Sequence, residues 1–169
     1  MPRFRHTAQP ALLLTLLWLV SPALPAAGVL EVSTLEGEHA RLSDYLERGR
    51  HTLVMVWTTY CTVCASEFPR IDALHRAHHD DGLKVLGVAV DGLAARASVQ
   101  AALDARGASF PSVLIERAEL AAGFHRYTGE TFRGTPTYLL FDGAGELAGH
   151  HVGRLDVDAV ARLLNDGGS

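Results

Sequence analysis

Two cysteines are the residues of this sequence whose type and spacing point most directly to chemistry. Cys61 and Cys64 are the only cysteines in the 169 residues, and Thr62 and Val63 lie between them. A pair at this spacing can act as a reversible dithiol–disulfide switch, supply two ligands to a metal ion, or form a structural disulfide. The choice among these three readings decides what the protein does.

The interpretations of the pair as a structural disulfide and as a metal site both have weaknesses. Closing so short a loop removes little entropy from the unfolded chain, so a purely structural disulfide would contribute little. A structural zinc site needs four ligands, and histidines would have to complete it because the sequence holds no second CxxC pair. A copper(I) carrier that uses both thiolates and a histidine such as His125 is a further alternative. The histidines considered as ligands are His75, His78, His79, His125, His150 and His151.

The elements expected around the pair favour the redox switch. Residues 52–58 (TLVMVWT) are apolar and β-branched almost throughout, which is typical of a strand buried on both faces. Residues 61–79 follow with apolar residues at helical spacing, interrupted by Pro69. A sulfur at a helix start faces unpaired amides and the positive end of the helix dipole, which favour the thiolate. The second cysteine lies one turn further on the same face and can close the disulfide.

The rest of the chain predicts alternating strands and helices. Residues 29–41 read as a hairpin that turns at Glu36-Gly37, and Ser43 is a candidate cap for the short turn that follows. The further strands are expected at 83–90, 112–115, 137–141 and 146–152, and the further helices at 94–106, 119–127 and 156–165, the last capped by Asp156. This order predicts an α/β fold with a central mixed sheet, helices on both faces and an N-terminal β-hairpin extension.

The first residues read as a targeting segment. A basic start at Arg3 and Arg5 precedes the apolar run 11–20 and the small residues and prolines of SPALPAA. This layout is that of a secretory signal peptide cleaved near Ala26 or Ala27. An uncleaved anchor is the alternative, although the apolar run covers only about half of the roughly 20 residues that a spanning helix needs. We therefore expect a signal peptide in residues 1–27 and one domain in residues 28–169.

Charge argues against nucleic acid as a partner. The formal net charge is −4, Lys84 is the only lysine, and no basic run with interleaved aromatic residues occurs. Nucleic-acid-binding domains concentrate lysine and arginine on one surface. Export would place the two cysteines in an oxidising compartment, where a thiol pair stays reduced only if it is resupplied with electrons.

The arrangement of these motifs resembles the thioredoxin superfamily. A buried strand precedes WTTYCTVC at a helix start, and Gly134-Thr135-Pro136 follows about 70 residues later. The longer string C-x-x-C-x-x-E-x-P, met by Cys61, Cys64, Glu67 and Pro69, resembles the exported TlpA/ResA-type disulfide reductases in particular. The resemblance implies a thioredoxin-like fold for residues 28–169.

The resemblance also implies roles for individual residues. Cys61 would be the attacking thiolate and Cys64 the resolving thiol. Thr135 and Pro136 would form a cis-proline segment that faces the pair and holds the backbone of a substrate. From the residues alone, a trans proline at the start of a strand is the commoner state.

Trp57, Tyr60, Glu67 and Asp91 are expected to support the centre, and Arg133 is a further candidate. Trp57 matches the tryptophan that packs beside the cysteines in this superfamily, and Tyr60 would border the substrate surface. Glu67 is either a supporting residue or an exposed helical carboxylate, which is the commoner state of glutamate. Arg133 is a candidate to lie near the thiolate.

The sequence departs from the pattern at two positions. Val63 stands where members of this branch often carry a proline, and Met55 stands where thioredoxins have a buried aspartate. The acid that would deprotonate Cys64 is therefore unassigned. Asp91 is the nearest alternative acid, and a solvated turn residue before Gly92 is the other reading of it.

The function expected from this reading is an exported thiol:disulfide oxidoreductase that works as a reductase on disulfide-containing proteins. It needs no organic or metal cofactor, acts as a monomer, and by resemblance receives electrons from a membrane thiol carrier. The alternatives are a disulfide-forming oxidase of the same fold and the copper carrier. Apocytochrome c, a copper-site assembly protein and a general pool of misoxidised proteins all fit as substrates, and the periplasm fits as the location.

Overall fold

The computed structural model describes residues 30–80 and 82–166. The expected signal segment, residues 1–27, lies outside these ranges. Within them, no helix combines the length and the apolar character that crossing a membrane requires.

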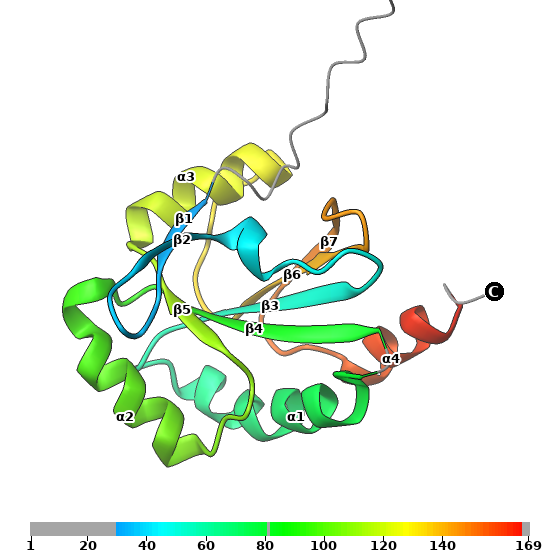
Figure 1. Cartoon of the computed structure of the whole chain (residues 1–169), viewed down its shortest axis with the longest axis horizontal. Helices are drawn as coiled ribbons and strands as arrows, with labels where there is room; N and C mark the ends of the chain where they lie inside the picture. The colour runs from blue at the N-terminus through cyan, green and yellow to red at the C-terminus, as the bar shows by residue number, and fades with distance from the viewer. Residues whose placement is uncertain (1–29, 81, 167–169) are drawn as a thin grey trace, which may run out of the picture.

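The described residues build one seven-stranded mixed sheet in the order β2-β1-β5-β4-β3-β6-β7 (Figure 1). Strand β3 (His51–Trp57) runs parallel to β4 (Leu83–Ala89) on one side and antiparallel to β6 (Thr137–Phe141) on the other. The expected mixed sheet is confirmed, and the strand that leads to the cysteines lies inside it, with neighbours on both sides.

The edges of the sheet are formed by the N-terminal hairpin and by the last strand. Strand β1 (Glu31–Ser33) pairs antiparallel with β2 (His39–Arg41) and also contacts β5 (Ser112–Leu114). Strand β7 (Leu147–Val152) pairs antiparallel with β6 at the opposite edge. The predicted hairpin extension is therefore an integral part of the sheet.

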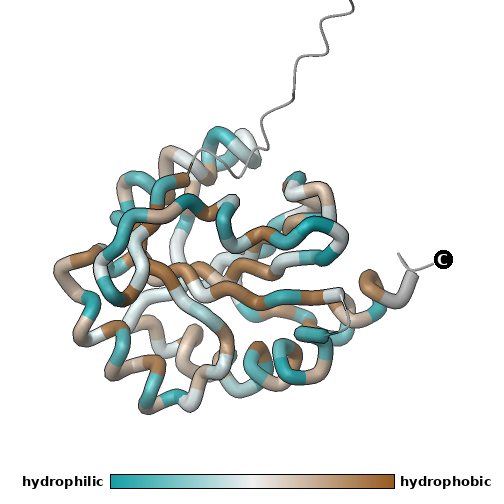
Figure 2. Tube along the Cα trace, viewed as in Figure 1, coloured by the Kyte–Doolittle hydropathy of each residue, from teal (hydrophilic) through white to brown (hydrophobic). Residues whose placement is uncertain are grey.

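Helices cover both faces of the sheet (Figure 1). Leu53, Met55 and Trp57 of β3 pack into the cluster that also holds buried residues of three helices, whereas Val54 and Val56 pack into the cluster on the other face. The helices of the first face are α1 (Thr62–His78), α2 (Arg96–Arg106) and α4 (Val157–Asp166), and α3 (Arg117–Thr128) covers the second. Because both faces are covered, the central strands are mostly hydrophobic, as Figure 2 shows, although β3 begins with His51 and Thr52 and β4 contains Lys84.

Helix α1 continues through Pro69, whereas the sequence suggested an interruption there. Proline removes the amide that would donate to the carbonyl four residues earlier, which weakens a helix locally. Phe68, Ile71 and Leu74 follow one buried face on both sides of the proline and pack into the same core cluster. The side chain of Pro69 is exposed, so this packing holds the helix together across the missing hydrogen bond.

Two expected caps have different outcomes. Asp156 caps α4 as predicted, because its Oδ1 accepts hydrogen bonds from the backbone N–H groups of Asp158 and Ala159, both at 3.1 Å. Ser43 is not a cap: it lies inside the short 3₁₀ helix η2 (Leu42–Tyr45), where Asp44 accepts the N–H of Arg41 instead. A second 3₁₀ helix, η3 (Leu93–Ala95), precedes α2.

Candidate active site

Cys61 and Cys64 lie where the inner strand β3 gives way to helix α1. Cys61 is the residue before the first turn of α1, and Cys64 is inside that turn. The two form a disulfide with an S–S distance of 2.07 Å and a Cα–Cα distance of 5.2 Å. Cys61 is half-buried and Cys64 is fully buried, so a partner can reach the first sulfur more readily than the second.

The sulfur of Cys61 lies in the amide field of the helix start. The backbone N–H of Cys64 donates to Sγ of Cys61 at 3.0 Å, so the sulfur occupies the position of a capping acceptor. The first amides of a helix have no partner within the helix and carry partial positive charge. This geometry would stabilise a thiolate at Cys61 more than at the buried Cys64.

A second segment approaches the pair from the start of β6. The Thr135–Pro136 peptide bond is cis, the isomer that the resemblance implies. The carbonyl oxygen of Thr135 lies 3.5 Å from Sγ of Cys61. The hydroxyl of Thr137 donates to the carbonyl of Gly134 at 2.6 Å across the bend. Residues about 70 positions apart in the sequence are thus in contact at the first sulfur.

Asp91 holds the loop that leads to Cys61. It follows β4, and its carboxylate accepts the N–H of Thr59 at 3.1 and 3.2 Å and the hydroxyl of Thr59 at 2.6 Å. Asp91 is half-buried, so the reading of it as a solvated turn residue is wrong. Its role as the acid for Cys64 stays a prediction.

Aromatic and apolar side chains lie near the cysteines both in the buried core and on the exposed surface. Trp57 is fully buried and meets Phe68 of α1 edge to face, with ring centroids 4.9 Å apart. Tyr60, next to Cys61, is 73% exposed, and Val63 is exposed between the cysteines. Trp57 therefore belongs to the core beneath the site, and Tyr60 to its rim.

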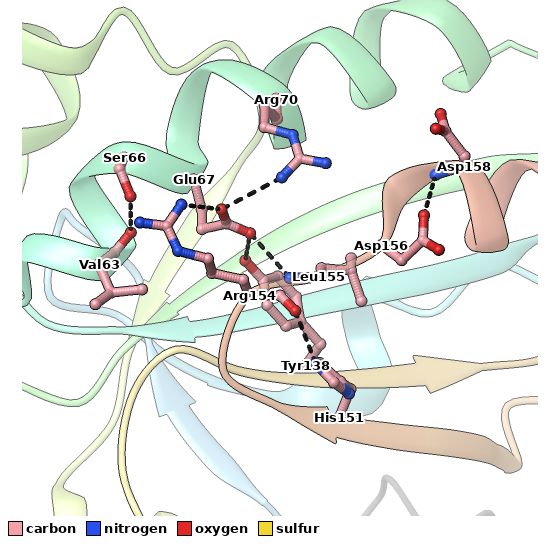
Figure 3. A network of polar contacts seen from close by, with 10 residues as sticks. All are labelled: Val63, Ser66, Glu67, Arg70, Tyr138, His151, Arg154, Leu155, Asp156 and Asp158. Atoms are coloured by element: carbon pink, nitrogen blue, oxygen red, sulfur yellow. Dashed lines mark hydrogen bonds and ion pairs between the residues drawn. The ribbon is translucent and has the colours of Figure 1, made fainter.

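Glu67 is completely buried, so its reading as an exposed helical carboxylate is wrong. It lies one turn after Cys64 on α1, and its Oε2 accepts the N–H of Leu155 at 2.9 Å and the hydroxyl of Tyr138 at 3.4 Å (Figure 3). Its Oε1 lies 3.6 Å from Nη1 of Arg70 and 3.7 Å from Nη1 of Arg154. The carboxylate thereby connects α1, the helix that carries both the cysteine pair and Glu67, to β6 and to the segment between β7 and α4.

The surroundings of Tyr138 shift the pKa of its hydroxyl. Burial raises the pKa of its hydroxyl, and the nearby Glu67 carboxylate raises it further. The phenol is therefore neutral under all ordinary conditions and remains a hydrogen-bond donor to Glu67.

Several residues of the site carry no sequence signal. Tyr138, Arg154 and Leu155 reach Glu67 from segments far along the chain, and Arg106 contacts the loop before Cys61. No local pattern marks these residues. Knowledge that Glu67 is buried would have indicated that polar partners surround its carboxylate. Of the other expected residues, Met55 is a buried core side chain, and Arg133 is exposed.

Metal ligands do not gather in the part of the chain that the structure describes. Among residues 30–80 and 82–166, no group of three or more histidine, cysteine, aspartate or glutamate side chains is placed to hold a metal ion. His125 is exposed, and its Nδ1 lies 3.2 Å from the carbonyl oxygen of Glu130.

Comparison with known proteins places these features in a family. The model of the AhpC/TSA family matches residues 24–150. Sporulation thiol-disulfide oxidoreductase A of Bacillus subtilis is 28% identical over 140 residues, which cover 82% of this chain and 78% of that protein. Thiol-disulfide oxidoreductase ResA of Halalkalibacterium halodurans is 27% identical over 130 residues, which cover 77% and 68%.

Solved structures show the same architecture. StoA from Bacillus subtilis superposes with a TM-score of 0.60 at 25% identity, over 83% of this chain and 98% of that one. A thiol:disulfide interchange protein of the thioredoxin family from Chlorobium tepidum superposes with a TM-score of 0.67 at 22% identity, over 86% and 98%. The thioredoxin-like fold expected from the sequence is confirmed.

Proposed function

This chain belongs to the AhpC/TSA family, and from that premise we propose that it is an exported thiol–disulfide oxidoreductase that reduces disulfides in partner proteins. The observation that carries the proposal is the position of the Cys61 sulfur. It accepts the N–H of Cys64 at the start of α1 and lies 3.5 Å from the Thr135 carbonyl, at the more accessible end of the pair.

The reaction uses the reduced form of the pair. The thiolate of Cys61 attacks one sulfur of a substrate disulfide, forms a mixed disulfide and releases the other substrate sulfur as a thiolate. Cys64, whose proton passes to that leaving thiolate, then attacks the sulfur of Cys61 and releases the second substrate sulfur as a thiolate, which takes up from solvent the proton that Cys61 lost when it ionised. The protein ends as the Cys61–Cys64 disulfide, and the substrate has gained two electrons and two protons.

The surface around Cys61 would bind the substrate. Thr135 is half-buried and its carbonyl lies next to the attacking sulfur, so we expect its backbone to form hydrogen bonds with an extended substrate segment. Tyr60 and Val63, which are close to Cys61 in sequence, are exposed. We expect this rim to favour substrates with apolar residues beside the cystine.

We infer the reducing direction from the residues between the cysteines. Thr62 and Val63 carry no charge, so thiolate stabilisation depends mainly on the helix start, and the couple should be reducing. Strong oxidants of this superfamily usually place a histidine between the cysteines. A reductase needs a continuing electron supply, which by resemblance is a membrane thiol carrier.

Location and assembly complete the proposal. Residues 1–27 would direct export to the periplasm and would be cleaved near Ala27, leaving a monomeric domain. N-terminal sequencing of the exported protein tests this, and an intact Met1 in the membrane fraction would support the anchor instead. Apocytochrome c, a copper-site assembly protein and a general pool of misoxidised proteins are the substrate classes to test.

One set of measurements on the purified domain tests the reductase against its two rivals. The wild-type chain should reduce a protein disulfide with dithiothreitol as electron donor, and replacement of both cysteines by serine should abolish turnover. Net disulfide formation in a reduced substrate would favour the oxidase. Stoichiometric copper(I) binding that needs His125, with no turnover, would favour the carrier.

A further inference from the structure

Arg106, the last residue of α2, contacts three segments around the cysteine pair. Its Nη2 donates to the carbonyl oxygen of Thr59 at 3.3 Å. Its Cζ lies 5.4 Å from the ring centroid of Trp57 and 5.1 Å from that of Phe68. Trp57 ends β3, Thr59 lies in the loop, and Phe68 is on α1. A single guanidinium therefore touches the strand, the loop and the helix that together position the cysteines.

The rings of Trp57 and Phe68 fix the position of the Arg106 guanidinium. Trp57 and Phe68 are both buried, and their edge-to-face contact presents a joint surface to the half-buried guanidinium. A guanidinium is attracted to the face of an aromatic ring, and more strongly where water is excluded. Its planar fork can stack on the rings and still donate to a carbonyl, a combination that a lysine ammonium provides only in part.

Thr59 is held from both sides by charged side chains. Asp91 accepts its N–H and its hydroxyl, and Arg106 donates to its carbonyl. The preceding residue, Thr58, contacts Cys61 directly: the N–H of Cys61 donates to the carbonyl of Thr58 at 3.3 Å. The backbone immediately before the attacking cysteine is thus fixed by residues from the ends of β4 and α2.

We propose that Arg106 is a positioning residue of the redox centre. It keeps the loop at Thr59 in the position that aims the N–H of Cys64 at Sγ of Cys61, and its positive charge lies against the carbonyl of Thr59, two residues before Cys61. Both effects favour the thiolate of Cys61 and hence the reduced form. The inference rests on the proposed function, because it concerns the reactivity of the same cysteine pair.

A purely structural role for Arg106 makes a different prediction. Its Nη1 also donates to the carbonyl of Ala102 at 3.1 Å, in the last turn of its own helix. Loss of that contact alone would destabilise the oxidised and the reduced protein equally. The equilibrium with an external thiol couple would then be unchanged, even if the melting temperature fell.

The test compares wild type with Arg106→Met, which keeps an apolar chain without charge, and Arg106→Lys, which keeps the charge without the fork. Arg96→Met, at the exposed start of the same helix, is the matched control. Each protein is equilibrated with reduced and oxidised glutathione, and its oxidised fraction is measured by thiol labelling. The rate at which iodoacetamide alkylates Cys61 in the reduced protein is measured at pH 7.

We expect the equilibrium constant of Arg106→Met to shift about 3- to 10-fold toward the disulfide, equivalent to about 15–30 mV. The alkylation of Cys61 should slow by a similar factor, Arg106→Lys should lie between wild type and Arg106→Met, and Arg96→Met should match wild type. If Arg106→Met matches wild type in both measurements while wild type exchanges with glutathione, the inference is overturned and the proposed function stands. If wild type itself fails to exchange, both are overturned.

Discussion

The backbone N–H of Cys64 points at the sulfur of Cys61 across 3.0 Å, so one cysteine of the pair supplies a hydrogen bond to the other. The relationship is asymmetric. Cys61 receives the amide and is half-buried, whereas Cys64 is fully buried. Two residues of identical chemistry are therefore expected to have different roles.

Trapping of partners should reveal this asymmetry. Cys64→Ser leaves the attacking thiol intact and removes the thiol that would release the substrate, so it should accumulate mixed disulfides through Cys61. Cys61→Ser should accumulate none, because the remaining thiol is buried. Non-reducing gels of protein isolated from the exported fraction provide the measurement. Equal trapping by both variants would show that the assignment of roles is wrong.

The midpoint potential should be that of a reductase. With Thr62 and Val63 uncharged, the reduced form has only the helix start and its surroundings to stabilise it, and we expect a potential of about −200 to −280 mV. Equilibration with dithiothreitol, followed by the fluorescence of Trp57 beneath the pair, gives the value. A potential near −120 mV, as in the strongest oxidant, would instead support disulfide insertion.

Tyr60 should contribute to substrate binding and little to stability. Its ring is 73% exposed beside Cys61, and loss of an aromatic contact with a substrate costs about 0.5–1.5 kcal/mol. Tyr60→Ala should therefore raise KM for a protein disulfide about 2- to 10-fold and leave the melting temperature nearly unchanged. Leu163→Ala, at an exposed apolar residue of α4, is the control. An unchanged KM would remove Tyr60 from the binding surface.

Glu67 should matter for stability far more than the arginines that face it. Glu67→Ala leaves the N–H of Leu155 and the hydroxyl of Tyr138 without their acceptor in a buried site, at a cost of about 2–4 kcal/mol. Arg154→Met removes an exposed partner and should cost less than about 1 kcal/mol. Urea unfolding at pH 7 measures both. Similar losses in the two variants would mean that the buried hydrogen bonds are not the main contribution.

Acid should weaken the link between α1 and the segment before β5. Asp72 accepts the N–H and the hydroxyl of Ser109 at 2.6 and 2.7 Å and pairs with Arg76. Burial alone would raise the pKa of Asp72, but these hydrogen bonds and the charge of Arg76 hold it below its ordinary value of 3.8. Such a carboxyl stabilises the fold above its ordinary pKa, and the contribution is lost as the pH falls through the folded-state pKa.

The corresponding variant is Asp72→Ala. It should lose about 2–3 kcal/mol at pH 7, and its difference from wild type should shrink as the pH falls below 3.8. Urea midpoints from pH 7 down to pH 2.5 test this, with Asp104→Ala at an exposed position of α2 as the control. A difference from wild type that does not change with pH would contradict the assignment.

Local patterns predicted the sheet and helices because each was specified by nearby residues. The largely apolar runs of β3 and β4 indicated strands covered on both faces, and Asp156 signalled its helix by a cap that acts within three residues. Pro69 was misjudged because a local helix breaker was outweighed by the core packing of Phe68 and Ile71. Tertiary contacts of that kind cannot be predicted from a short stretch of the sequence.

The site was predicted where it depended on spacing and missed where it depended on contacts between distant segments. The cysteine pair and the Thr135–Pro136 segment carry recognisable motifs. The sequence allowed Glu67 to be either a supporting residue or an exposed carboxylate, because its buried partners Tyr138 and Leu155 are 71 and 88 positions away. Arg106 reaches Thr59 across 47 positions and belongs to no motif.

The position of β3 within the sheet has a consequence for the exchange of its backbone amides with solvent. Its residues from Thr52 to Val56 have register partners on both β4 and β6. Backbone amides in such a strand exchange with solvent only through large-scale opening of the protein, whereas sheet edges and terminal helices open at lower free energy. We therefore expect the backbone amides of β3, which leads to the cysteine pair, to exchange more slowly than those of the edge strand β7 and of helix α4.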